Sequence, residues 1–124
     1  MSVRTKYKTE KYEVVVIGGG LSGMCAAIAA ARKGAKTVLI HGRHVLGGNA
    51  SSEIRMHICG ASENMEKPEL EEGGILYELM LENKSRNDYF NYSVWDMVLF
   101  EAVKKQENLT VYLNSVVDSC GVKE

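Results

Sequence analysis

The sequence predicts an α/β fold with a parallel sheet, and three observations near its beginning carry this prediction. A run of mostly β-branched residues at 12–17, typical of a strand buried on both faces, ends in three consecutive glycines. An alanine-rich stretch at 21–33 has the composition of a helix, and Gly34 stands where a helix C-terminal glycine is expected. A second apolar run follows at 37–40. Together these segments predict a right-handed parallel βαβ unit.

The next segment, residues 42–67, holds neither a strand period nor a helical period for long and is rich in glycine, serine and asparagine. Such a segment is typical of a long functional loop. Apolar residues then recur at helical spacing, which predicts a helix that begins near Pro68, with Gly73 and Gly74 able to delay its start.

The last third of the chain predicts one more helix and one more strand. Ser93 is the expected cap of a helix that ends near Gln106. Residues 110–117 predict a third strand, and we expect the parallel sheet in the order 3-2-1. Trp95 and its aromatic neighbours are expected to pack in the core rather than to stack on the aromatic ring of a ligand. These neighbours are Tyr89, Phe90 and Tyr92.

Composition limits the class of protein. The 124 residues suffice for one domain, and the net charge of −1 predicts no nucleic-acid partner. No apolar stretch is long enough to span a membrane, and the first ten residues lack the apolar core of a signal peptide. The three cysteines are widely spaced and predict neither a disulfide framework nor a metal site. We therefore expect a cytoplasmic protein.

The pattern Gly18-x-Gly20-x-x-Gly23 lies between the first expected strand and helix, which is the context of a dinucleotide-binding fingerprint. In that fingerprint the first glycine permits a tight turn, the second lets the backbone approach a pyrophosphate, and the third allows close packing of the helix on the sheet. Backbone N–H groups at the helix start would face the phosphates. The expected phosphate site comprises Gly18, Gly19, Gly20, Leu21, Ser22 and Gly23. The alternative is a glycine-rich turn without a ligand.

The fingerprint places an acid at the end of the second strand to hold ribose hydroxyls, and in this sequence the position falls on His41. A neutral imidazole can accept one hydrogen bond and could serve a ribose hydroxyl. The alternative is a loop histidine that faces water. Arg43, beyond Gly42, could bind a 2′-phosphate, so NADP stays open as a ligand at this point.

These motifs resemble those of the FAD-dependent oxidoreductases with the glutathione-reductase type of nucleotide-binding fold, especially a bacterial subgroup of uncharacterised members. The resemblance covers residues 14–23, 38–40, 46–55, 91–96 and 113–115. Its most specific part is Gly47-Gly48, because such proteins carry a glycine pair where the backbone passes the flavin side of the dinucleotide. It implies a Rossmann-like fold and FAD as cofactor, bound also by Asn49 and by the backbone of Val117 at the adenine.

In that family a later strand with a Gly-Asp pair closes the FAD site, and this sequence ends at Glu124 without one. We therefore expect residues 1–124 to be the N-terminal part of an FAD-binding domain, with an incomplete sheet and no substrate domain. The full-length protein would be an oxidoreductase with a small-molecule substrate, and the 124 residues alone would be inactive. Two alternatives remain: an NAD(P)-binding or catalytically silent truncated module, and a flavoenzyme without net redox chemistry, such as a hydratase or lyase.

No catalytic residue is assigned from the sequence. Arg55, His57 and Cys59 follow the second glycine pair at spacings that would put them on one face of an extended segment, where they could reach a flavin. Ordinary surface or packing roles are the alternative for each of them. The exposed edge of the first strand is expected to allow self-association of the chain.

Overall fold

The computed structural model describes residues 7–63, 70 and 72–122. Its elements, in chain order, are strand β1 (Val14–Ile17), helix α1 (Leu21–Arg32), strand β2 (Thr37–Ile40), short 3-10 turns η1 (Gly48–Ala50) and η2 (Gly60–Glu63), helix α2 (Gly74–Arg86), helix α3 (Tyr92–Lys104) and strand β3 (Leu109–Tyr112). The βαβ unit is confirmed, with β2 at the expected residues and Gly34 in a left-handed conformation (φ 91°) just after α1.

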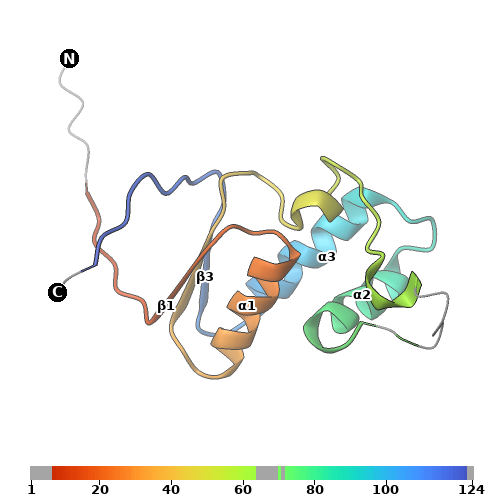
Figure 1. Cartoon of the computed structure of the whole chain (residues 1–124), viewed down its shortest axis with the longest axis horizontal. Coiled ribbons are helices and arrows are strands. Elements are labelled where there is room, and N and C mark those ends of the chain that lie inside the picture. The colour runs from red at the N-terminus through yellow and green to blue at the C-terminus, as the bar shows by residue number, and fades with distance from the viewer. Residues whose placement is uncertain (1–6, 64–69, 71, 123–124) are drawn as a thin grey trace, which may run out of the picture.

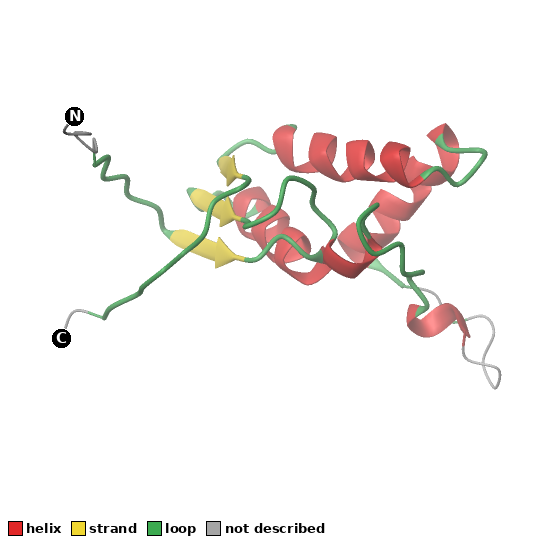
Figure 2. Cartoon of the chain, turned by 90° about the horizontal axis from the view of Figure 1, so that it is seen from above, coloured by secondary structure: helices red, strands yellow, loops and turns green. Residues whose placement is uncertain are grey.

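The three strands form a parallel sheet in the order β1-β2-β3, as expected. Val15 pairs with Val38, which pairs with Thr110 on its other side. All three helices lie on one side of the sheet, and the terminal segments lie on the other (Figures 1 and 2). The connection from β1 to β2 and the connection from β2 to β3 both step in the same direction across the sheet. Because such connections are right-handed, α1 and α3 lie on the same face. Helix α2 packs on α1 and α3.

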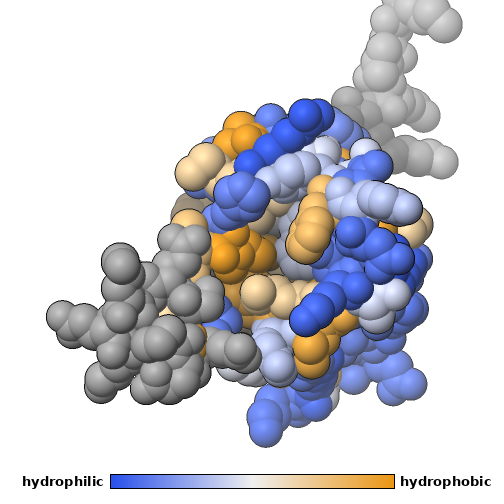
Figure 3. Space-filling view, turned by 90° about the vertical axis from the view of Figure 1, so that its right-hand side faces the viewer, coloured by the Kyte–Doolittle hydropathy of each residue, from blue (hydrophilic) through white to orange (hydrophobic). Residues whose placement is uncertain are grey.

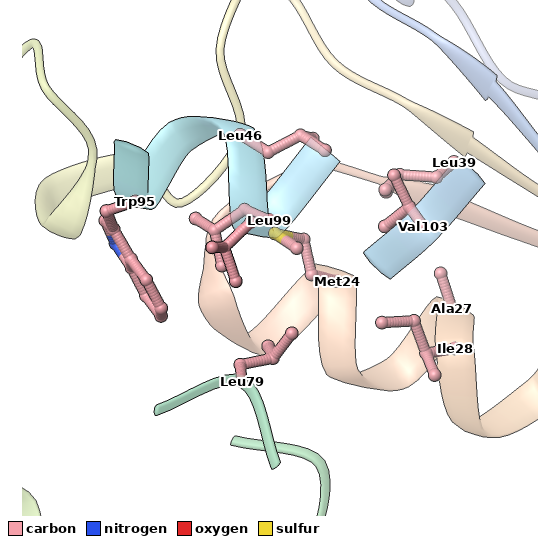
Figure 4. Close-up of a cluster of buried hydrophobic side chains, with 10 residues drawn as sticks. Met24, Ala27, Ile28, Leu39, Leu46, Leu79, Trp95, Leu99 and Val103 are labelled. Atoms are coloured by element: carbon pink, nitrogen blue, oxygen red, sulfur yellow. The ribbon is translucent and has the colours of Figure 1, made fainter. Parts of the chain in front are cut away.

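The hydrophobic core lies between this face of the sheet and the helices. Trp95 of α3 is 6% exposed and belongs to a cluster with Met24 of α1 and Leu79 of α2 (Figure 4). Core packing of Trp95 is therefore confirmed. The same expectation is wrong for Tyr89 and Phe90, which are 94% and 81% exposed, because both lie in the turn between α2 and α3, outside the packed faces of the helices.

One expectation about β1 is wrong. Val15 and Ile17 are 53% and 61% exposed, so β1 is buried on one face only. The described helices all cover the other face, against which Val16 packs. The central strand β2, flanked by both neighbours, is buried along most of its length, as expected.

The starts of the two later helices compare differently with expectation. Helix α2 begins at Gly74, after an extended Gly73, in line with the delay that these two glycines allowed, and Pro68 lies outside the described residues. The cap of α3 is Asn91 rather than Ser93: the Asn91 side chain accepts a hydrogen bond of 2.8 Å from the backbone N–H of Ser93. The amide oxygen of Asn91, two residues earlier, satisfies one of the orphan N–H groups at the start of α3.

Strand β3 ends at Tyr112, before the expected limit at Val117. Beyond it, the N–H groups of Asn114 and Ser115 donate to the carbonyl oxygens of Arg43 (3.1 Å) and His41 (3.0 Å). These bonds hold the chain after β3 beside the chain after β2, but without a regular ladder. The two segments thus leave the sheet together.

Candidate dinucleotide-binding site

The candidate site lies at the edge of the sheet where the parallel strands end. Gly18 follows β1, His41 follows β2, and both lie at this edge because the strands run in the same direction. In open parallel sheets, ligands bind outside the carboxyl ends of the strands. The sequence motifs that suggested a ligand are therefore collected where the fold favours one.

The first glycine motif has the conformation that its expected roles require. Gly18 has a left-handed φ of 105°, and its N–H donates to the Ile40 carbonyl at 2.8 Å. A Cβ on Gly20 would have nothing within 4 Å, which leaves the backbone open to a ligand. A Cβ on Gly23 would lie 1.9 Å from the Gly18 carbonyl oxygen, so close packing of α1 on β1 needs a glycine there. Contact of these residues with phosphates stays a prediction.

The N-terminus of α1 carries no side-chain cap and no acidic residue in its first turn. The first backbone bond of the helix runs from the Met24 N–H to the Gly20 carbonyl at 2.9 Å. The N–H groups of Leu21 and Ser22 have no acceptor among the residues that the structure describes. Such orphan donors, with the positive end of the helix dipole, suit an anionic group.

The second glycine pair lies directly against the first motif. The Gly47 N–H donates to the Gly19 carbonyl at 2.8 Å, and Gly20 and Gly47 form an isolated parallel bridge. Gly47 and Gly48 both have positive φ (101° and 59°), and a Cβ on Gly48 would lie 3.2 Å from the Gly20 Cα. Side chains at this crossing would force the two backbones apart. The structure thus joins two motifs that the sequence presents 24 or more residues apart.

The residues at this crossing fit the diphosphate of a dinucleotide. Gly18 and Gly20 leave space that a Cβ would fill, and uncapped N–H groups lie next to it. Asn49, the next predicted contact, is exposed, and its carbonyl accepts a hydrogen bond of 2.8 Å from the Met56 N–H. Its amide side chain has no partner that the structure describes, so it is available to a ligand.

Both ring nitrogens of His41 lie next to backbone groups, and ribose contact by His41 stays a prediction. Its Nδ1 accepts a hydrogen bond of 2.9 Å from the Gly19 N–H, and its Nε2 lies 3.0 Å from the Val45 carbonyl oxygen. A carbonyl only accepts, so Nε2 carries the proton and the ring is neutral. The residue is half-buried, and in this geometry neither ring nitrogen is left for a ribose hydroxyl. Ribose binding by His41 would require one of these bonds to break.

Arg43 is engaged within its own loop. Its Nη1 donates to Glu53 Oε2 at 2.9 Å, and His44 Nδ1 lies 3.6 Å from the other oxygen of the same carboxylate. The hydrogen bond from Arg43, followed by the nearby positive charges, lowers the pKa of Glu53. A 2′-phosphate here would meet the Glu53 carboxylate beside the guanidinium. This arrangement disfavours NADP.

The remaining predicted contacts lie at the border of the site. Gly42 is exposed, with the Val116 side chain 3.6 Å from the position of its missing Cβ. Val117 is half-buried and follows β3 instead of lying within it. Adenine contact by Val117 stays a prediction.

The structure does not gather Arg55, His57 and Cys59 into a cluster. Arg55 has a left-handed φ of 62°, and its Nε donates to the Ser52 carbonyl at 3.0 Å, so the segment is not uniformly extended. All three residues are exposed, and the Cys59 thiol lies 3.8 Å from the His57 carbonyl oxygen. The expectation that they share one face of an extended segment is therefore not met at Arg55.

Two residues that sequence reasoning missed hold the loop after Gly48. Ser51 is fully buried, and its hydroxyl donates to the Gly48 carbonyl at 2.7 Å. The Asp96 carboxylate on α3 accepts a hydrogen bond of 3.0 Å from the Ser52 N–H. Both residues lie in segments that carried the family resemblance, but the bond between Ser52 and Asp96 spans 44 positions and leaves no local pattern.

A groove on the helical side of the described molecule is a poor ligand site. The groove, of about 210 Å³, lies between α1, α2 and α3, away from the glycines. Its charged side chains are paired: Arg32 lies 2.7 Å from Glu78, and Arg86 lies 2.8 Å from Glu101. The side of the molecule that carries α2 is largely hydrophilic, with scattered apolar patches (Figure 3). In the described part of the chain, no cluster of residues suits a metal ion, and no helix is long and apolar enough to cross a membrane.

The fold and the site together define a dinucleotide-binding α/β domain. The chain belongs to the FAD dependent oxidoreductase family, whose model matches residues 13–124. Membership of this family indicates FAD as the cofactor. The resemblance read from the glycine motifs is thereby confirmed.

Two curated relatives are similar to a shorter part of the chain. Glycerol-3-phosphate dehydrogenase of Mycobacterium leprae (strain TN) is 39% identical over 51 residues, which are 41% of this chain and 9% of the relative. Glycerol-3-phosphate dehydrogenase 2 of Mycobacterium tuberculosis (strain ATCC 25618 / H37Rv) is 42% identical over 48 residues, which are 39% of this chain and 8% of the relative. The matched segment is thus less than a tenth of either relative.

Proposed function

We propose that residues 1–124 form the N-terminal part of the FAD-binding domain of an oxidoreductase and hold the diphosphate region of the cofactor. The observation that carries this proposal is the bridge between Gly20 and Gly47, which puts both glycine motifs beside the uncapped start of α1. Family membership supports FAD as the ligand of this crossing.

Each group at the crossing has a distinct part in binding. The N–H groups of Leu21 and Ser22 donate to phosphate oxygens, and the helix dipole favours the negative charge. Gly20 and Gly48 let the ligand approach the backbone, and the loop at 42–67, of which the structure describes residues 42–63, is the segment next to the cofactor. Bound FAD supplies the electron-transfer chemistry, so the work of these residues is to bind and orient it.

The alternatives are weaker but distinct. An NAD(P)-binding or catalytically silent module needs no second glycine pair, and the pairing of Arg43 with Glu53 works against a 2′-phosphate. A hydratase or lyase that binds FAD without net redox chemistry would use the same site. The substrate is a small molecule of unassigned identity, since the similarity to glycerol-3-phosphate dehydrogenases covers too little of those proteins to indicate one.

We also propose that the protein acts in the cytoplasm and that the isolated chain self-associates through β1. An odd number of widely spaced cysteines suits a reducing compartment. Strand β1 lies at an edge of the described sheet, and Val15 and Ile17 are exposed on it. Unpaired edge groups next to an apolar face favour association with another copy.

The proposed function is tested by titrating the chain with FAD and with NADP and following flavin fluorescence and heat of binding. We expect FAD to bind, weakly because only part of its contacts come from these residues, and NADP not to compete with it. For protein purified with a bound ligand, denaturation and identification of the released molecule provide a second test. Release of NADP, or tighter binding of NADP than of FAD, would contradict the assignment.

A further inference from the structure

The His41 ring connects three backbone segments at the candidate site. It extends from the end of β2, accepts a hydrogen bond from Gly19 in the glycine turn at 2.9 Å, and contacts the Val45 carbonyl in the next loop at 3.0 Å. Gly19 is held from its other side as well, since its carbonyl accepts from the Gly47 N–H at 2.8 Å. Both polar groups of Gly19 are therefore fixed, immediately before Gly20.

Few other side chains could make both contacts. A carboxylate at this position would accept from the Gly19 N–H but has no proton to donate to the Val45 carbonyl. A lysine would donate but could not accept. A neutral imidazole with its proton on Nε2 does both at once, and the ring is packed so closely that a Cβ on Gly19 would lie 2.8 Å from its Cγ. The histidine is thus matched to two backbone groups of opposite polarity.

We propose that His41 is a positioning residue that holds the glycine turn and the 42–47 loop in the arrangement that accepts FAD, and that protonation of its Nδ1 opens this contact. The inference rests on the proposed function. A protonated Nδ1 would put two N–H groups face to face, and the Gly19 bond would be lost. Imidazole groups change protonation between about pH 8 and pH 5. Protonation of the ring therefore weakens the binding of FAD.

The charged groups around the ring come from one loop. Glu53 lies near enough for electrostatic interaction with His41, and Arg43 and His44 pair with the same carboxylate. The glycine turn on the opposite side contributes only backbone groups, and the end of β3 contacts His41 through the Tyr112 carbonyl, which accepts from the His41 backbone N–H at 2.8 Å. His44 is a second imidazole in the same loop, so a pH profile alone does not identify the ring responsible.

Two substitutions separate the two contacts. In His41→Asn the amide oxygen takes the place of Nδ1 and accepts from the Gly19 N–H at every pH, but the donor to Val45 is lost. In His41→Gln the amide nitrogen reaches the place of Nε2, and the acceptor for Gly19 is lost. Glu107→Gln is the control, because Glu107 is exposed and lies between α3 and β3, at the opposite edge of the sheet from this contact.

The test combines FAD titrations from pH 8 to pH 5 with nitrogen NMR of the imidazole rings and exchange of the Gly19 amide in the chain without FAD. We expect the Nε2–H form of His41 and a protected Gly19 amide at pH 8, with protection lost at pH 5. FAD affinity should fall on the order of tenfold over this range, the loss expected for one broken hydrogen bond. His41→Asn should remove most of this pH dependence, Glu107→Gln should keep it, and His41→Gln should bind weakly at pH 8.

An NMR spectrum at pH 8 that shows a water-exposed His41 ring with its proton on Nδ1 in some molecules and on Nε2 in others would overturn the proposal. The proposal would also be overturned if FAD affinity depended equally on pH in His41→Asn and in the unchanged chain. Absence of FAD binding by the unchanged chain at pH 8 would instead contradict the proposed function, and the NMR measurements would still decide whether the contact exists.

Discussion

A Cβ atom on Gly23 would lie 1.9 Å from the carbonyl oxygen of Gly18 and 3.1 Å from its carbonyl carbon. Real Cβ atoms do not approach backbone so closely, and neither partner is a flexible side chain that could move away. The first turn of α1 therefore packs on the end of β1 at a distance that only glycine permits.

Gly23→Ala should lower the free energy of unfolding by about 1–3 kcal/mol, because the added methyl group forces α1 away from β1. Urea unfolding followed by circular dichroism measures the change. Gly121→Ala is the control, since a Cβ at Gly121 would have nothing within 4 Å. Equal stability of the two variants would contradict the close packing.

Gly20→Val should abolish FAD binding and leave the helical content nearly unchanged. The new side chain enters open space in the chain itself but occupies the position expected for the pyrophosphate. Isothermal titration and circular dichroism measure the two properties separately. Gly121→Val should bind FAD like the unchanged chain, and unaltered affinity in Gly20→Val would refute the predicted phosphate position.

Asn91→Ala should destabilise the fold by about 1 kcal/mol, because it removes the side chain that caps α3. Ser93→Ala should change stability little, since Ser93 contributes its backbone N–H and not its hydroxyl to the cap. Urea unfolding of both variants distinguishes the two residues. A larger loss of stability in Ser93→Ala than in Asn91→Ala would show that Ser93 is the cap, as the sequence alone predicts.

Acid should weaken the fold partly through Glu101. Hydrogen bonds from Arg86 and then Lys105 lower the pKa of Glu101 from 4.5 to about 2. A carboxylate with a lowered pKa in the folded state adds stability above pH 4.5, and this stability is lost as the pH falls toward 2. Glu101→Gln should therefore flatten the dependence of melting temperature on pH in this window. Glu107→Gln is the exposed control and should leave the slope unchanged.

Replacement of both Val15 and Ile17 by threonine should reduce self-association of the isolated chain. The two side chains are 53% and 61% exposed on β1, and threonine keeps the strand propensity while adding a polar group. Light scattering after size-exclusion chromatography measures the mass. Val122→Thr is the control, at a side chain that is 96% exposed and lies outside the strands. A monomeric unchanged chain would remove the basis of this prediction.

Much of the fold could be predicted from the sequence because its signals are local. The β-branched run before Gly18, the alanine-rich helix and the glycine at 34 each act on neighbouring residues, so their patterns survive without tertiary contacts. The same holds for the conformations of Gly18 and Gly23. A helix boundary was missed where two nearby residues could each cap the helix. At the start of α3, Asn91 and Ser93 are both good capping residues.

Burial of β1 and the arrangement of the site were decided by the tertiary structure. The outer face of β1 is exposed because no described layer packs on it. The residues of a strand do not by themselves indicate whether helices will cover one face of the sheet or both. The His41 ring meets Gly19 across 22 positions, and Gly47 meets Gly20 across 27. By itself, the sequence determined that a dinucleotide-binding turn follows the first strand. Only chain folding brought the second glycine pair and the histidine to that turn, because contacts between distant segments depend on how the whole sheet and its helices pack.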